Sequence, residues 1–76
     1  MNIQILGAGC AKCRTLAEHA EQAARTLGLA FTIEKVTDPA AIAAMGVMRT
    51  PALAVDGVVK TMGRVPTADE IKPLLA

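Results

Sequence analysis

The first half of this 76-residue chain alternates short strand patterns with a long helical one. Residues 2–6 (NIQIL) and 30–36 (AFTIEKV) alternate in side-chain character and carry β-branched residues, which is typical of strands. Between them, apolar residues recur at helical spacing from Cys13 to Leu27, and Gly28 is a good C-terminal stop. Two strands joined through a helix lie parallel, with a right-handed crossover. This unit constrains the fold more than any other feature of the sequence.

A strong hairpin signal follows in the second half of the chain. Residues 51–55 (PALAV) and 58–62 (VVKTM) have the composition of strands, and Asp56-Gly57 between them is a two-residue turn that favours an antiparallel pair. Upstream, Asp38-Pro39 is typical of a helix start, with aspartate as the cap, and Gly46 ends that helix. The sequence therefore predicts a short second helix and then a hairpin.

The last segment predicts a third helix. Thr67 and Glu70 have the spacing of a capping box, in which each side chain binds the backbone N–H group of the other residue. Pro73 removes one helical hydrogen bond, so we expect this helix to be short or kinked. Its predicted inner face consists of Ile71, Leu74 and Leu75.

Together these elements give the order β-α-β-α-β-β-α, which predicts an α/β fold with a four-stranded mixed sheet flanked by helices on both faces. The chain is long enough for a single domain, residues 1–76, and too short for two. Hydrophobic residues make up 53% of the sequence, so disorder is not expected, but only 1% is aromatic. The core must therefore be small and closely packed.

Charge and hydropathy exclude several classes of function. Eight Lys and Arg residues stand against seven Asp and Glu, which predicts no surface for nucleic acid. The apolar runs are too short to span a membrane, and the N-terminus lacks the basic start and apolar stretch of a secretory signal. We therefore expect a soluble, cytoplasmic protein with no membrane partner. In that compartment a cysteine pair is more often catalytic or metal-binding than a permanent disulfide.

Cys10 and Cys13, the two cysteines of the chain, are three positions apart. A structural disulfide between them would close a very short loop, worth roughly 2 kcal/mol, and would tie no distant elements together. Redox chemistry fits better, because Cys10 lies where a glycine-rich loop meets a helix N-terminus and Lys12 and Arg14 add positive charge, which favours a thiolate. Cys13, one turn into the apolar face of the helix, is suited to resolve a mixed disulfide that Cys10 forms.

Soft-metal binding is the alternative that these residues leave open. Small metal-carrier domains also place two cysteines at this spacing after a first strand, but their order is β-α-β-β-α-β, whereas residues 38–46 add a helix here. Zinc usually takes four ligands, and the one other candidate, His19, is predicted to face solvent on the outer side of its helix. We therefore predict no metal site, and no cofactor beyond the redox-active pair Cys10–Cys13.

Several motifs of this chain resemble the thioredoxin fold. Cys10-Ala11-Lys12-Cys13 follows the first strand, Thr50-Pro51 opens the third, and a hairpin and Gly63 come next. The likeness covers nearly the whole chain, which is similar to the small thioredoxin-like group of redox-active disulfide proteins. It implies that Pro51 is cis and packs beside the disulfide, that the backbone of Thr50 pairs with the substrate, and that Gly63 belongs to the same substrate groove.

The resemblance also implies an activity for the cysteines and indicates which residues surround them. Proteins of this group exchange electrons between their own dithiol and the disulfides of other proteins, so we expect protein disulfide substrates, a reductase partner and a monomer. The cations expected around the disulfide, where they modulate it, are Lys12, Arg14, Arg49 and Arg64. The apolar rim expected beside them consists of Ala8, Ala11, Val47, Met48 and Met62.

Overall fold

The computed structural model describes residues 1–7 and 11–75, and its elements follow the predicted order. The strands and helices are β1 (Asn2–Leu6), α1 (Ala11–Thr26), β2 (Thr32–Val36), α2 (Pro39–Ala44), β3 (Ala52–Val55), β4 (Val58–Met62) and α3 (Ala68–Leu75). The order β-α-β-α-β-β-α is therefore confirmed. In the described part of the chain, no helix is long and apolar enough to cross a membrane.

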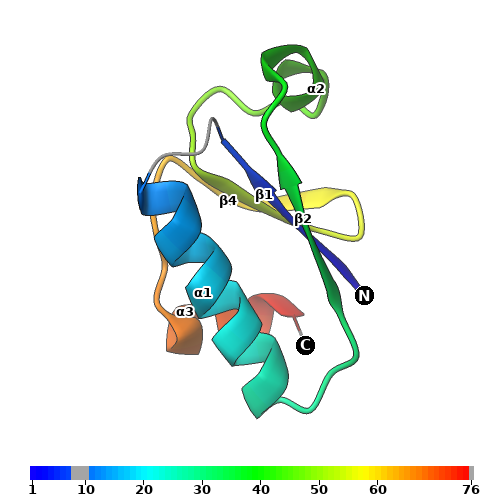
Figure 1. The fold of residues 1–76 in the computed structure, drawn as a ribbon, viewed down its shortest axis with the longest axis vertical. Helices are drawn as coiled ribbons and strands as arrows, with labels where there is room; N and C mark the ends of the chain where they lie inside the picture. The colour runs from blue at the N-terminus through cyan, green and yellow to red at the C-terminus, as the bar shows by residue number, and fades with distance from the viewer. Residues whose placement is uncertain (8–10, 76) are drawn as a thin grey trace.

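The four strands form one mixed sheet in the order β2-β1-β3-β4 (Figure 1). β1 and β2 run parallel, with Leu6 opposite Val36 at their carboxyl ends. β3 pairs antiparallel with both β1 and β4, with Ala52 lying between Leu6 and Met62. This register brings the end of β1, the start of β3 and the end of β4 to one end of the sheet. α1 begins at the same end, because the chain enters it directly after β1 (Figure 1).

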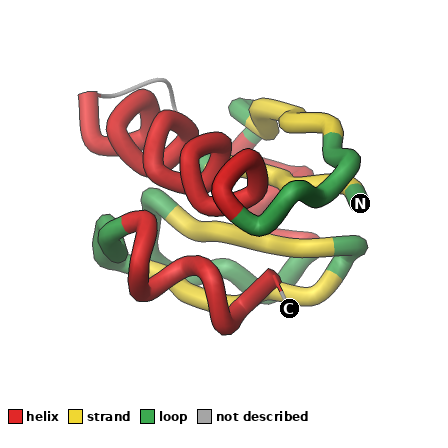
Figure 2. The backbone as a smooth tube through the Cα atoms, turned by 90° about the horizontal axis from the view of Figure 1, so that it is seen from below, coloured by secondary structure: helices red, strands yellow, loops and turns green. Residues whose placement is uncertain are grey.

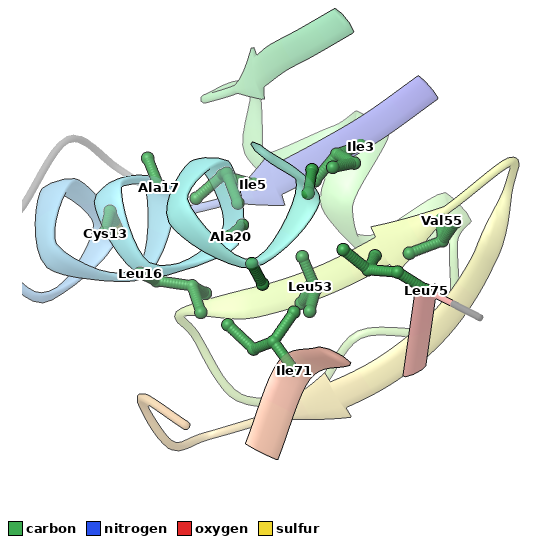
Figure 3. Packing of buried hydrophobic residues seen from close by; sticks show 12 residues of the cluster. Ile3, Ile5, Cys13, Leu16, Ala17, Ala20, Leu53, Val55, Ile71 and Leu75 are labelled. Atoms are coloured by element: carbon green, nitrogen blue, oxygen red, sulfur yellow. The ribbon is translucent and has the colours of Figure 1, made fainter. Parts of the chain in front are cut away.

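Helices cover both faces of the sheet, as the sequence predicts. α1 and α3 contact each other over one face (Figure 2), where Ile3 and Leu53 from the central strands meet Leu16 and Ile71 from the helices (Figure 3). Four alanines complete the buried face of α1: Ala17, Ala20, Ala23 and Ala24. Their small side chains let the helix approach the sheet closely, which is how a core with so few aromatic residues stays densely packed.

α2 covers the opposite face with a smaller core. Ile42 from the helix and Val47 from the loop behind it pack against Leu6, Ala52 and Ala54 of the two central strands. The helix begins as predicted, since the carboxylate of Asp38 accepts a hydrogen bond of 3.1 Å from the N–H group of Ala40.

The β3–β4 hairpin turns at Asp56-Gly57, where both residues have positive φ values of 50° and 85°. This is the geometry that makes aspartate and glycine favourable in a two-residue turn. Asp56 also anchors β1, because its N–H group donates to the carbonyl of Asn2 and its carboxylate accepts from the N–H group of Asn2, both at 2.8 Å.

The capping box at α3 forms as predicted. The N–H group of Thr67 donates to the carboxylate of Glu70 at 3.0 Å, and the N–H group of Glu70 donates to the hydroxyl of Thr67 at 3.2 Å. The helix is short, with eight residues and Pro73 inside it. Of the predicted inner face, Ile71 and Leu75 are buried, and Leu74 is partly buried against the same core.

Some boundaries differ from the prediction. β2 begins at Thr32 rather than at residue 30, because its partner strand β1 begins at Asn2, which lies opposite Thr32. β3 begins one residue after Pro51, which lacks the N–H group that a strand ladder needs. Leu27 was predicted on the buried face of α1 but is 39% exposed. Its N–H group still donates to the carbonyl of Ala23, but it lies past the last helical residue, Thr26, and the chain turns at Gly28, which has a φ of 69°.

Candidate functional site

Cys13 lies in the first turn of α1 and is buried, with 7% of its surface exposed. Its Sγ atom lies so close to Gly7, just after the end of β1, that a Cβ atom on residue 7 would overlap it. The same Cβ position is 3.7 Å from the Cβ atom of Thr50, so Gly7 also adjoins the segment before β3. The absence of a side chain at residue 7 therefore makes room for the sulfur between β1 and the loop that carries Thr50.

Cys10, the predicted nucleophile, lies outside the described residues, as does Ala8 of the predicted apolar rim. The division of work between Cys10 and Cys13 therefore stays a prediction from the sequence. The buried position of Cys13 agrees with what that prediction requires of the resolving cysteine.

The Thr50–Pro51 peptide bond is cis, as the resemblance implied. Pro51 is buried whereas Thr50 is exposed. The carbonyl of Pro51 accepts a hydrogen bond of 3.0 Å from the N–H group of Gly63, the first residue after β4. This bond ties the loop before β3 to the loop after β4, so the two segments that carry the predicted substrate-binding residues Thr50, Pro51 and Gly63 are held together by backbone contact.

Arg49 and Gly63 pack directly on each other. A Cβ atom on Gly63 would lie 3.1 Å from both the Cβ and the Cδ atom of Arg49, so the aliphatic stem of the arginine lies flat against the glycine. Gly63 has a φ of +76°, which L side chains rarely adopt, so both its backbone and its surroundings favour glycine. The structure therefore brings Arg49 and Gly63 together, next to Pro51.

The four cations predicted around the cysteines differ in their surroundings. Lys12 and Arg14 are exposed in the first turn of α1, and Arg49 is exposed before β3. Arg64 instead pairs with Glu70 of α3, with 3.3 Å between its Nη1 atom and the carboxylate oxygen. The N–H group of Thr67, and after it Arg64, lowers the pKa of Glu70 below its ordinary value of 4.5. Arg64 is thus engaged in holding the start of α3.

The predicted apolar rim is only partly correct. Met48 is 91% exposed and Met62 44% exposed, and Ala11 is exposed as well. Val47 was also placed in the rim, but it is buried, with 7% of its surface exposed, in the core under α2. The reason is that the chain turns back after α2, where the N–H group of Val47 donates to the carbonyl of Ile42 and the side chain faces the sheet.

The prediction that His19 faces solvent is wrong. The side chain is half-buried, and its Nδ1 atom lies 2.9 Å from the carbonyl oxygen of Pro66. Because a carbonyl only accepts, Nδ1 carries the proton and donates it. A helical pattern identifies the face of α1 that meets the sheet, but not the flank that meets the connection between β4 and α3. Of the described residues, no three His, Cys, Asp or Glu side chains gather where they could hold a metal ion.

Gly7 is a site residue that the sequence pattern did not single out. Its N–H group donates to the carbonyl of Val36 at 2.9 Å, which extends the β1–β2 ladder by one residue. A glycine that follows a strand and precedes a cysteine on the next helix is the signal that could have identified it, since a close approach of sulfur to backbone requires the smallest residue.

Comparisons with known proteins agree with this arrangement. The family model described as a thioredoxin domain matches residues 1–76. A protein named thioredoxin from Methanothermobacter thermautotrophicus is 43% identical over 76 residues, covering 100% of this chain and 99% of its own length. A second protein named thioredoxin, from Methanocaldococcus jannaschii, is 41% identical over 70 residues, covering 92% of this chain and 80% of its own. With its mixed sheet, helices on both faces and cis proline before β3, this chain belongs to the thioredoxin-domain family.

Proposed function

We propose that this protein is a small dithiol–disulfide oxidoreductase that exchanges electrons with protein disulfides through Cys10-Ala11-Lys12-Cys13. The observation that carries the proposal is the position of Cys13, which is buried against Gly7 and next to the segment of Thr50 in a chain of the thioredoxin-domain family. Both relatives described above are named thioredoxin, which supports a thiol–disulfide oxidoreductase in general.

The reaction balances with the two thiols alone. The thiolate of Cys10 attacks one sulfur of a target disulfide, which forms a mixed disulfide and releases the other target sulfur as a thiolate that takes up a proton. Cys13 then loses its proton and attacks Cys10, which releases the second target thiol and leaves a Cys10–Cys13 disulfide. Two electrons pass to the target, and a reductase restores the dithiol. No cofactor beyond the pair takes part.

Burial supports the assignment of Cys13 to the second step. A protein disulfide is bulky and needs an accessible thiolate, whereas an intramolecular attack needs only proximity to Cys10. The backbone at Thr50 and Pro51, with Gly63 beside them, forms the groove in which the chain around the target cysteine lies. We further propose a monomer that works in the reducing cytoplasm, where thiol pairs of this kind are redox-active rather than structural.

The experiment that tests the proposal combines turnover with trapping. Insulin is incubated with dithiothreitol, with and without the protein, and the protein should accelerate the reduction of insulin. Cys13→Ser should accumulate mixed disulfides with target proteins, because no thiol remains to release them, whereas Cys10→Ser should trap far fewer. Equal trapping by the two variants would overturn the assigned roles, and no acceleration of insulin reduction would overturn the activity.

The reduction potential of the Cys10–Cys13 pair is the second measurement that tests the proposal. Equilibration of the protein in glutathione buffers should give a reversible two-electron couple roughly between −270 and −180 mV, the range from thioredoxin to protein disulfide isomerase. A pair that stays reduced throughout that range would count against a role in disulfide exchange.

A further inference from the structure

Three segments of the chain meet beside Cys13 at one end of the sheet. The first turn of α1 carries Cys13, and the loop before β3 reaches it through the close approach of Thr50 to Gly7. The loop after β4 joins them through the hydrogen bond from Gly63 to Pro51. Side chains that point outward from these three segments therefore lie at the end of the sheet that holds Cys13.

Three exposed cations without an ion pair among the described residues lie on two of these segments. Lys12 and Arg14 lie on the first turn of α1, and Arg49 lies before Thr50; we refer to these three residues as the cationic rim. Within residues 1–7 and 11–75, no carboxylate forms an ion pair with any of them, as is also true of Lys35 and Lys60. Arg64, which directly follows Gly63 at this end, pairs with Glu70 and is therefore not counted in the rim. The three positive charges of the rim exceed the net charge of the whole chain, which is only +1.

Lys12 and Arg14 lie where cations are unfavourable for a helix, in the first turn of α1. This turn contains no acidic residue, although the positive end of the helix dipole favours carboxylates there and disfavours Lys12 and Arg14. Helix stability alone therefore does not account for the two cations. Both cations, and Arg49 with them, were predicted from the sequence to modulate the cysteines, and Arg49 differs from the other two in packing on Gly63 of a second segment.

Arg49 is held in place before any partner arrives. Its Cβ and Cδ atoms both lie 3.1 Å from where a Cβ atom on Gly63 would be. The N–H group of Gly63 in turn donates a hydrogen bond to the carbonyl of Pro51. An arginine whose stem is already packed loses less rotamer freedom on binding than a mobile one. Its guanidinium can bind a carboxylate with two parallel hydrogen bonds, which fixes orientation as well as charge.

Two exposed methionines complete the surface. Met48 directly precedes Arg49, and Met62 directly precedes Gly63, so both flank the packed pair. Met48 is 91% exposed, and thioethers adapt to partners of differing shape. Apolar contacts of this kind suit a polypeptide. A polyanion such as nucleic acid would call for more cations than three, since six to ten phosphate contacts are common for its binding.

We propose that the cationic rim, with Met48 and Met62, binds an acidic polypeptide segment next to the cysteines of the target disulfide, so that the substrates are acidic proteins. This rests on the proposed function and names its substrate class. The charges steer the target toward the cysteines, and Arg49 fixes the register of the segment in the groove formed by Thr50, Pro51 and Gly63.

The test uses two disulfide peptides that differ only in charge. Both contain one internal disulfide in the same backbone; one carries Asp and Glu next to the cysteines, and the other carries Asn and Gln. The reduced protein is mixed with each peptide, the reaction is quenched by acid and alkylation, and mass spectrometry gives the second-order rate constant for oxidation of the protein. Because both peptides meet the same thiolate, the ratio of their rate constants cancels any effect of the rim on thiol reactivity.

The acidic peptide should react about tenfold faster at low salt, and the ratio should fall toward one as salt screens the charges. Arg49→Gln keeps most of the stem and removes the charge, and it should lower the ratio about two- to fivefold. Arg25→Gln is the matched control, since it removes the same charge near the far end of α1, and it should leave the ratio unchanged.

Three results would overturn the inference and leave the proposed function standing. Equal rate constants for the two peptides would leave the oxidoreductase activity intact and remove the acidic preference. If the ratio falls equally in Arg49→Gln and Arg25→Gln, the preference for the acidic peptide comes from the overall charge of the protein and not from the rim. An oligonucleotide that inhibits as strongly as an excess of the acidic peptide would assign the rim to a nucleic acid. If neither peptide is reduced, the proposed function itself fails, and this inference fails with it.

Discussion

The sulfur of Cys13 lies so close to the backbone of Gly7 that a Cβ atom on residue 7 would overlap it, so the side chain of Cys13 packs directly on the backbone after β1. The contact holds the thiol against the end of β1 and close to Thr50, which carries the cis bond to Pro51. It also explains how a chain with a small core buries a cysteine in the first turn of a helix: the neighbouring strand contributes only backbone at that point.

Gly7→Ala should destabilise the protein by about 1–3 kcal/mol, because the added methyl group overpacks the site of the sulfur. Urea unfolding of the reduced protein gives the stability, and the alkylation rate of Cys13 in a Cys10→Ser background reports its displacement. Gly46→Ala is the control: a Cβ atom meets nothing there within 4 Å, but the φ of +78° makes the backbone unfavourable. It should lower stability without changing the alkylation rate, and an unchanged rate in Gly7→Ala would contradict the proposed contact.

His19→Ala should cost about 1 kcal/mol, because it removes the donor that satisfies the carbonyl of the buried residue Pro66. His19→Gln, which retains an N–H donor, should cost less. Urea midpoints of both variants are compared with that of Gln22→Ala, which truncates an exposed side chain on the same helix and should change little. Equal midpoints for His19→Ala and Gln22→Ala would show that the contact between α1 and Pro66 adds nothing to stability.

Acid should weaken the start of α3 through Glu70. Because the folded-state pKa of Glu70 is lowered from 4.5, the unfolded chain binds more protons between the two pKa values, so stability rises with pH in that window. The contribution is present above about 4.5 and is lost as the pH falls through the lowered pKa. Denaturant midpoints measured from neutral to acid pH should therefore differ between the wild type and Glu70→Gln at neutral pH and converge in acid.

Arg64→Gln extends that test to the second cause of the shift. It should reduce the pH-dependent difference without abolishing it, because the N–H group of Thr67 still donates to Glu70. If the denaturant midpoints of the wild type and Glu70→Gln instead fall in parallel as the pH is lowered, Glu70 does not cause the acid sensitivity of α3.

Zinc should stabilise the reduced protein very little. A structural zinc site needs four ligands, and among the described residues no three candidate ligands gather. In addition, Nδ1 of His19 already donates a hydrogen bond to the carbonyl of Pro66. Thermal melting with and without stoichiometric zinc measures the effect, which should be a shift of no more than a few degrees. A large zinc-dependent rise, together with no oxidation in glutathione buffers, would favour a soft-metal carrier over an oxidoreductase.

The sequence by itself determined the elements and their order, because the signals that encode them act over a few residues. Asp38 before Pro39, Thr67 with Glu70, and Asp56-Gly57 each satisfy backbone groups of their own segment, and all three formed as predicted. The alternating strands, the crossover helix and the hairpin then leave few topologies open, so the mixed sheet followed as well.

The tertiary structure decided which side chains meet across elements. Val47 is buried, His19 binds the carbonyl of Pro66, Arg64 pairs with Glu70, and Gly7 accommodates the sulfur of Cys13. None of these contacts follows from a helical or strand period, because a period identifies the face that meets the sheet and is silent about loops packed on the flanks. Close packing selects such partners only after the elements and loops are placed against one another, since it depends on how one segment lies on the next and not on the pattern within either.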